Sequence, residues 1–192
     1  MILAALPTVL TPEDLEAMGE EGLQYEMLYG VPREVEGMSE RHGAIAGRLH
    51  VYLGSYVLEH ELGEIFSSDT RFVFLTTPPS VLAPDIAFIS AARLAATRLA
   101  EGFSRRVPDL VVEVASPSNS EARILQKISI YLAHGVRAVW LVRPGPRTVT
   151  IFRPDGPEVI LAGDQELDGG DILPGFRLPL ARLFRLLDEA AS

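Results

Sequence analysis

The chain has 192 residues, of which 47% are hydrophobic, so it can bury the core of one domain. It has no cysteine, which excludes disulfides and thiolate metal sites, and no apolar run approaches the roughly 18 residues of a transmembrane helix. Residues 1–7 lack the basic start and the apolar length of a signal peptide, so we expect a cytoplasmic protein with no membrane partner.

The net charge of −9 is unevenly distributed along the chain. Residues 1–66 carry 3 basic and 12 acidic side chains, residues 67–153 carry 11 and 6, and residues 154–192 carry 3 and 8. A local basic surface can bind phosphate despite a negative total. The basic middle third is therefore compatible with nucleic acid, although chance produces the same distribution.

The first part of the chain is expected to form helices around a pair of strands. Thr11 is a good N-cap, and Ser39 is another ahead of apolar side chains at helical spacing. The expected elements are a helix over 11–18, strands at 24–28 and near 35, and a helix over 39–61.

From residue 64 onward, short β-rich runs separated by turn residues predict strands. The expected order is strands at 65–66 and 72–75, a turn at 78–80, a strand at 86–89, a helix over 91–99, a strand at 110–115, a helix over 121–134, a strand at 136–142, a hairpin at 148–152 and 158–161, and a helix over 180–190. The strand–helix–strand order over 110–142 predicts a parallel crossover. The surrounding hairpins make the fold class mixed α/β (α+β) in a single domain over residues 1–192.

Lys127 is the one lysine among 17 basic residues, and the carboxylate of Glu113 lies inside the apolar run 110–115. A charge in such a strand is costly unless it is paired or bound to a metal. Alternation along the strands places Asp85 and Glu113 on defined faces of the sheet. The helix over 121–134 packs back on that sheet, so Lys127 can deliver its ammonium to both carboxylates.

Two carboxylates and an ammonium suit the hydrolysis of a phosphodiester. Asp85 and Glu113 would hold Mg²⁺, with Mn²⁺ as the alternative, because Mg²⁺ prefers oxygen ligands. The ion polarises the phosphate and lowers the pKa of a bound water, and Lys127 would orient that water or stabilise developing charge. A buried structural network of the same three side chains fits the spacing equally well.

Several short motifs are specific in combination. They are Tyr25-Glu26, Gly30, Met38-Ser39, His42, Gly63, Pro84-Asp85, Val112-Glu113-Val114-Ala115-Ser116-Pro117-Ser118, Lys127, Tyr131, Gly135-Val136, Trp140-Leu141-Val142 and Pro174-Gly175-Phe176. Together they resemble the restriction-endonuclease family of Uma type, within the PD-(D/E)XK nuclease superfamily. The likeness covers about residues 11–186.

The resemblance implies a restriction endonuclease-like fold, with a central mixed sheet flanked by helices. It implies a metal-dependent DNA endonuclease in which Asp85 and Glu113 are catalytic metal ligands and the backbone carbonyl of Val114 is a further one. DNA is then the expected partner. The resemblance also suggests a homodimer that cuts both strands.

The resemblance assigns the lysine and one further acid as well. The superfamily's lysine usually lies two residues after the acid, at Ala115 here, but in this family it has moved to the following helix, which matches Lys127. Glu26 corresponds to the family's N-terminal acid at the same site, and a half-exposed strand acid is the alternative. The chain departs from the family at Arg123 and Arg143, where acids are common.

Other residues carry open alternatives. His42 could contact phosphate or orient water, or be an ordinary histidine on a helix surface. Arg105 and Arg106 could bind the phosphate backbone of the substrate or belong to a solvated loop. Tyr131, one turn after Lys127, is expected to pack against the lysine stem, with a hydrogen bond in the site as the alternative. Trp140 is expected to be a core residue.

A different class of function competes with the nuclease. The chain could be a non-catalytic interaction or nucleic-acid-binding protein that retains the nuclease fold. The acidic total charge favours this alternative, and the intact set of Asp85, Glu113 and Lys127 opposes it. A metal phosphohydrolase acting on nucleotides is a third possibility.

Overall fold

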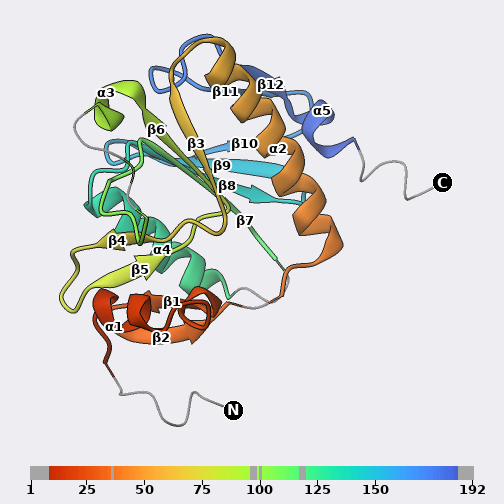
Figure 1. The fold of residues 1–192 in the computed structure, drawn as a ribbon. Helices are drawn as coiled ribbons and strands as arrows, with labels where there is room; N and C mark the ends of the chain where they lie inside the picture. The colour runs from red at the N-terminus through yellow and green to blue at the C-terminus, as the bar shows by residue number, and fades with distance from the viewer. Residues whose placement is uncertain (1–8, 36, 96–98, 100, 117–119, 186–192) are drawn as a thin grey trace.

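The computed structural model describes residues 9–35, 37–95, 99, 101–116 and 120–185. A large sheet forms the centre of the fold, with helices on both of its faces (Figure 1). β7 and β8 run parallel, and the other neighbouring pairs of this sheet run antiparallel. The order across the sheet is β10 (Val159–Leu161), β9 (Thr148–Phe152), β8 (Ala138–Arg143), β7 (Leu110–Val114), β6 (Ile86–Ser90) and β3 (Gly63–Ser67). The expected central mixed sheet flanked by helices is confirmed.

Side chains of β7 alternate between two cores. Val112 and Val114 pack with α2 (Glu40–Glu59), whereas Val111 packs on the opposite face with α4 (Glu121–Ala133). Glu113 therefore projects on the α4 face, because residues two apart in a strand share a face.

α2 is long but amphipathic. It buries one stripe of side chains and exposes the rest of its surface, and Ser39 caps its first turn. Its buried positions are His42, Ile45, Leu49, Leu53 and Val57. Among the described residues, no helix has both the length and the apolar character that a membrane crossing requires.

α4 begins at the side-chain cap of Ser120, and Gly135, with a φ of 93°, follows its end. The helix buries a wide face toward the sheet, as its amphipathic pattern predicts. Leu125 lies outside that face and is 45% exposed, whereas Ile130 is buried.

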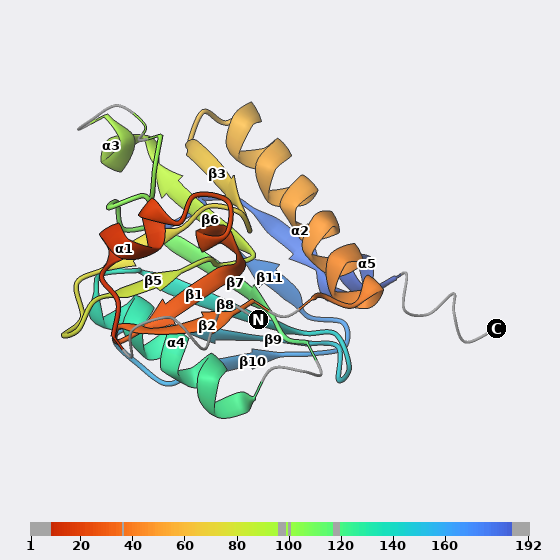
Figure 2. The ribbon, with the colours of Figure 1, turned by 60° about the horizontal axis from the view of Figure 1, so that its bottom comes forward.

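A smaller sheet covers the α4 side of the molecule (Figures 1 and 2). Its order is β2 (Val31–Glu34), β1 (Tyr25–Leu28), β5 (Ser80–Leu82) and β4 (Phe72–Phe74). Phe74 packs edge-on against Tyr131 of α4, with ring centroids 5.3 Å apart. This packing places β1, and with it Glu26, beside α4.

Short elements complete the fold. They are α1 (Pro12–Ala17), η2 (Gly22–Gln24), α3 (Ala91–Leu94), β11 (Glu166–Asp168), β12 (Arg177–Pro179) and α5 (Leu180–Phe184). α3 ends earlier than the predicted helix over 91–99, of which residues 96–98 lie outside the described part. The same holds for residues 186–190 of the predicted last helix. The strands β5, β11 and β12 were not predicted.

Candidate active site

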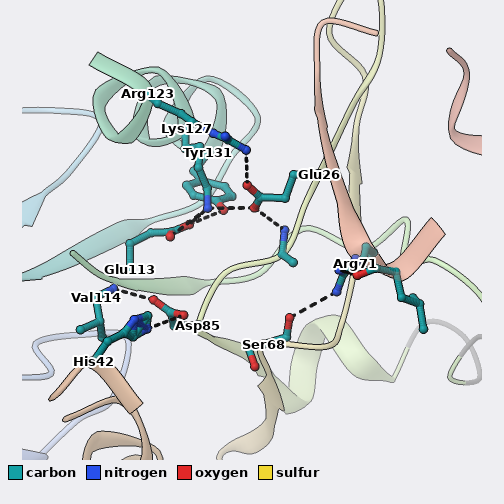
Figure 3. A network of polar contacts seen from close by, with 12 residues as sticks. Glu26, His42, Ser68, Arg71, Asp85, Glu113, Val114, Arg123, Lys127 and Tyr131 are labelled. Carbon is teal, nitrogen blue, oxygen red and sulfur yellow. Dashed lines mark hydrogen bonds and ion pairs between the residues drawn. The ribbon is translucent and has the colours of Figure 1, made fainter. Parts of the chain in front are cut away.

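The site lies at the end of the strands β6 and β7 where their pairing stops. The last paired residues at this end are Ile86 and Val112, so Asp85 and Glu113 are opposite each other one step further. Beyond the end of β6, the backbone N–H of Val114 donates to Oδ2 of Asp85 at 2.6 Å. Antiparallel pairing thus brings together two carboxylates that are 28 positions apart in the chain (Figure 3).

Asp85 is held from two sides. Its Oδ1 lies 3.0 Å from Nε2 of His42, in the first turn of α2. Burial raises the pKa of Asp85 to about 6, although the Val114 N–H and the charge of Lys127 oppose the increase. Burial also lowers the pKa of His42, so a neutral imidazole with its proton on Nε2 donates to the carboxylate. His42 is only 3% exposed, so the alternative of a surface histidine is wrong.

Glu113 is bound by two side chains of α4. The Nζ of Lys127 lies 2.7 Å from Oε1 and 2.9 Å from Oε2 of Glu113, and the hydroxyl of Tyr131 donates to Oε1 at 2.6 Å. Burial raises the pKa of Glu113 to about 7, against the lowering effect of Lys127, and the charges of Asp85 and Glu26 add to the increase.

Glu26 reaches the same lysine from β1. Its Oε1 lies 2.9 Å from Nζ of Lys127 and accepts the Ala83 N–H at 3.0 Å, and its Oε2 lies 3.2 Å from Arg123. Burial raises the pKa of Glu26, but Lys127, the Ala83 N–H and Arg123 together outweigh burial and lower it. Glu26 is 5% exposed, so the alternative of a half-exposed strand acid is wrong.

Lys127 lies between these acids and keeps its proton. Burial lowers its pKa, but the charges of Glu113 and Glu26 outweigh burial and raise it. The Lys127 ammonium pairs with Glu26 and Glu113, Arg123 pairs with Glu26, and Asp85 is held instead by His42 and the Val114 N–H. Among the described residues, three carboxylates thus have two cations directly paired with them. This excess of negative charge suits the binding of a cation.

Two further residues of α4 contact the acids of the site. Arg123, where the family often has an acid, pairs with Glu26, and Tyr131 both packs in the core as expected and donates to Glu113, which was the alternative for it. Together with Lys127 they follow a spacing of four, which places side chains on one helix face. That spacing is the sequence signal that could have identified them. Trp140, by contrast, is buried in the core as expected.

The acids open into a pocket of about 730 Å³. Its polar walls come from β1, β2, α2, the ends of β6 and β7, and α4, and they include Glu26, Arg33, His42, Asp85, Glu113, Ser116, Arg123 and Lys127. A substrate can therefore approach the acids from solvent.

Arg105 and Arg106 are not brought to this pocket. The backbone of Ser104 exchanges hydrogen bonds with Arg71 and Val73, which ties the segment to the edge of β4. Arg105 pairs with Glu13 of α1 at 2.7 Å, and neither arginine is among the pocket-lining residues.

The donor atoms at the site fit a hard cation such as Mg²⁺. Within the described part of the chain, no three His, Asp or Glu side chains are grouped as a metal cluster. Mg²⁺, however, is usually bound through one or two carboxylates and several waters, and Asp85 and Glu113 supply that number. The N–H and C=O of one strand residue point to the same side, so the carbonyl of Val114 is directed to the Asp85 edge as well.

Comparisons with known proteins identify the family and the fold. The model of a protein family, Uma2, described as "Putative restriction endonuclease", matches residues 12–181. The structure is similar to a crystal structure of "a putative nuclease belonging to DUF820" from Anabaena variabilis ATCC 29413, with a TM-score of 0.80 and 22% identity over 93% of this chain and 99% of that one. At this identity the likeness shows the fold. No curated protein matches the chain. The resemblance seen in the sequence and the expected nuclease-like fold are confirmed.

Proposed function

The chain belongs to the Uma2 family, and on that premise we propose that it is a metal-dependent endonuclease that hydrolyses phosphodiester bonds in DNA. The observation that supports this most is that Glu26, Asp85 and Glu113 line one open pocket, in which Lys127 pairs with Glu26 and Glu113. Burial and mutual repulsion raise the pKa values of Asp85 and Glu113, and a divalent cation would relieve that repulsion.

Asp85, Glu113 and the carbonyl of Val114 would hold Mg²⁺ or Mn²⁺. When bound, the ion would polarise the phosphate and lower the pKa of a water molecule. His42 and the Val114 N–H hold the Asp85 carboxylate in place, and Tyr131 does the same for Glu113.

Lys127 acts as a cation rather than as a base. Its raised pKa keeps it protonated at neutral pH, and Glu26 fixes the position of Nζ. In the reaction, the oxygen of water forms a bond to phosphorus, the ester P–O bond breaks, and a proton passes to the leaving oxygen. Lys127 stabilises the negative charge that develops on the phosphoryl oxygens.

The substrate contacts come from arginines at the pocket. Arg33, on β2, and Arg123, on α4, line the pocket and can reach phosphates that flank the cleaved bond. A homodimer would present two such pockets to the two strands of a duplex, and sedimentation of the protein with duplex DNA tests this assembly.

A non-catalytic nucleic-acid-binding or interaction protein is the second candidate. The observation that favours it is the closeness of Lys127 to both oxygens of Glu113, which satisfies this carboxylate within the protein. In that case the acids and the lysine form a structural network.

Nicking of supercoiled plasmid separates the two functions. We expect the wild type to nick DNA with Mg²⁺ or Mn²⁺ and Glu113→Gln to lose about a hundredfold or more of that activity. Glu64→Gln is the matched control, because Glu64 is an exposed acid on β3, and it should retain full activity. Equal activity of Glu113→Gln and the wild type would exclude the proposed site.

A further inference from the structure

A second pocket, of about 510 Å³, adjoins the first. His42, Ser116 and Ile124 line both pockets, so the two share a wall. Ala115 and Ser116, which line the second pocket, directly follow Val114. The second pocket therefore begins next to the proposed metal ligands.

The walls of the second pocket combine an apolar surface with positive charge. Its charged members are Arg41, Arg143 and Glu121, and its apolar members are Ala115, Ile124, Pro144 and Pro146. Arg143 is paired with Glu121 and donates to Thr150 at 3.1 Å. Arg41 is exposed in the first turn of α2 and has no hydrogen bond or ion pair with another described residue, so its guanidinium is available to an anion.

We propose that this second pocket receives an unpaired nucleotide that neighbours the scissile phosphate, an assignment that rests on the proposed nuclease function. A nucleotide carries a flat base with apolar faces and an anionic phosphate, which match the apolar wall and Arg41 respectively. The shared wall places this pocket next to the proposed site of cleavage.

The same chemistry selects against intact duplex. In a duplex each base face is covered by its stacked neighbours, so a base can lie on Ile124 and Pro146 only when it leaves the stack. The preferred substrate is therefore DNA with unpaired stretches, such as tails, flaps, frayed ends or the locally opened regions of a supercoiled plasmid.

Binding measured without divalent ions tests the assignment independently of cleavage. Fluorescence anisotropy of labelled single-stranded, tailed and blunt duplex DNA should show at least about fivefold tighter binding of the first two by the wild type. Arg41→Ala should weaken single-strand binding about tenfold and reduce the salt slope of its binding constant by about 0.7. Arg177→Ala is the control, because Arg177 is an exposed arginine on β12 outside both pockets, and it should bind like the wild type.

Gly145 offers a second variant that leaves the fold intact. It lines the second pocket, its backbone is not in the left-handed region, and a Cβ there would meet no atom within 4 Å. Gly145→Glu should abolish the preference for unpaired DNA, because it adds bulk and negative charge. Gly145→Gln adds the bulk without the charge and should retain more of the preference for unpaired DNA.

The outcomes separate this inference from the proposed function. If the wild type nicks DNA while Arg41→Ala and Gly145→Glu bind every DNA form like the wild type, the second pocket is not a nucleotide site and the nuclease stands. If the wild type prefers blunt duplex, the assignment to unpaired DNA is wrong. If the wild type neither binds nor nicks any DNA, the proposed function fails and this assignment fails with it.

Discussion

At the scale of single residues, the charge balance of the pocket depends on Lys127. Its ammonium is the link between Glu26 and Glu113, which reach it from a strand of each sheet. A buried charge whose partner is removed becomes strongly unfavourable, so the consequences of losing Lys127 extend beyond catalysis.

Replacing Lys127 with Met should destabilise the protein by about 3–5 kcal/mol at about pH 8, because Glu113 loses its charged partner and Glu26 keeps Arg123 alone. The loss should be smaller at about pH 5, where Asp85 and Glu113 are protonated. Urea unfolding at both pH values measures the difference, and Lys127→Arg, which keeps the charge, should recover part of it. Equal stability of Lys127→Met and the wild type at the higher pH would contradict this charge balance.

The raised pKa values of Asp85 and Glu113 predict how stability varies with pH. Between its ordinary pKa of 4.5 and its folded pKa of about 7, Glu113 binds more protons in the folded than in the unfolded protein. The free energy of unfolding of the metal-free protein therefore falls as pH rises through this window. The loss is about 1.4 kcal/mol for each unit by which the pKa is raised, which makes a few kcal/mol in total. Glu113→Gln should remove much of that slope in unfolding experiments. An unchanged slope would show that Glu113 is not the titrating group.

The same groups predict how metal binding depends on pH. Protons compete with the metal for Asp85 and Glu113 below pKa values of about 6 and 7. Affinity for Mg²⁺ should therefore increase from about pH 5.5 to about pH 8 and then level off. Calorimetric titrations across this range measure it, and an affinity that is independent of pH would exclude these carboxylates as ligands.

Residue types and strand alternation suffice to select Asp85, Glu113 and Lys127 as candidates, and the family resemblance adds Glu26. They do not reveal that Tyr131 donates to Glu113, because that contact depends on how α4 is rotated on the sheet. The pairing of Arg123 with Glu26 could not be predicted either, because it depends on where the smaller sheet packs beside α4. The long-range contacts of polar groups were the unpredictable part of the site.

At the scale of elements, the first turn of α2 serves both pockets. His42 contacts Asp85, and Arg41 lines the second pocket. The Ser39 hydroxyl accepts the backbone N–H of His42 at 3.2 Å and so fixes this turn. The N-cap is thus coupled to the position of a proposed metal ligand.

Ser39→Ala should destabilise the protein by about 1 kcal/mol, as the loss of an N-cap does, and should weaken metal binding through His42. Ser55→Ala, at an exposed position within the same helix, should change stability by less than about 0.5 kcal/mol. Thermal unfolding with and without Mg²⁺ measures both effects. Identical behaviour of the two variants would show that the cap does not support the site.

The elements that could be predicted are those with a strong local signal. α2 and α4 have apolar side chains at helical spacing, β6 to β8 are nearly continuous apolar runs, and their positions agree with expectation. β5 is a strand because Val81 pairs with Met27 on one side and Val73 on the other, and residues 78–80 carry local turn signals instead. β5 therefore depends on pairing between distant segments of the chain, which a local sequence pattern does not reveal.

At the scale of the whole molecule, a protein of net charge −9 is proposed to bind DNA. Four arginines nevertheless line the two pockets, namely Arg33, Arg41, Arg123 and Arg143. Local potential rather than total charge determines where a phosphate backbone binds.

This arrangement predicts salt-dependent DNA binding with a small footprint. For two to four phosphate contacts, the logarithm of the binding constant should fall with the logarithm of salt concentration with a slope of about −2 to −4. Anisotropy titrations at several salt concentrations measure the slope, and Arg33→Ala should reduce it by about one. A slope near zero would contradict phosphate binding at these pockets.

The central claim, a metal-dependent nuclease site at Asp85, Glu113 and Lys127, is tested most directly by calorimetric titration of Mg²⁺ and Mn²⁺ into the wild type and Asp85→Ala, with plasmid nicking assayed on the same samples. We predict that the wild type binds metal and nicks DNA and that Asp85→Ala loses both. Binding of neither ion by the wild type, or equal binding and nicking by the two proteins, would contradict the claim and leave these residues as a structural network.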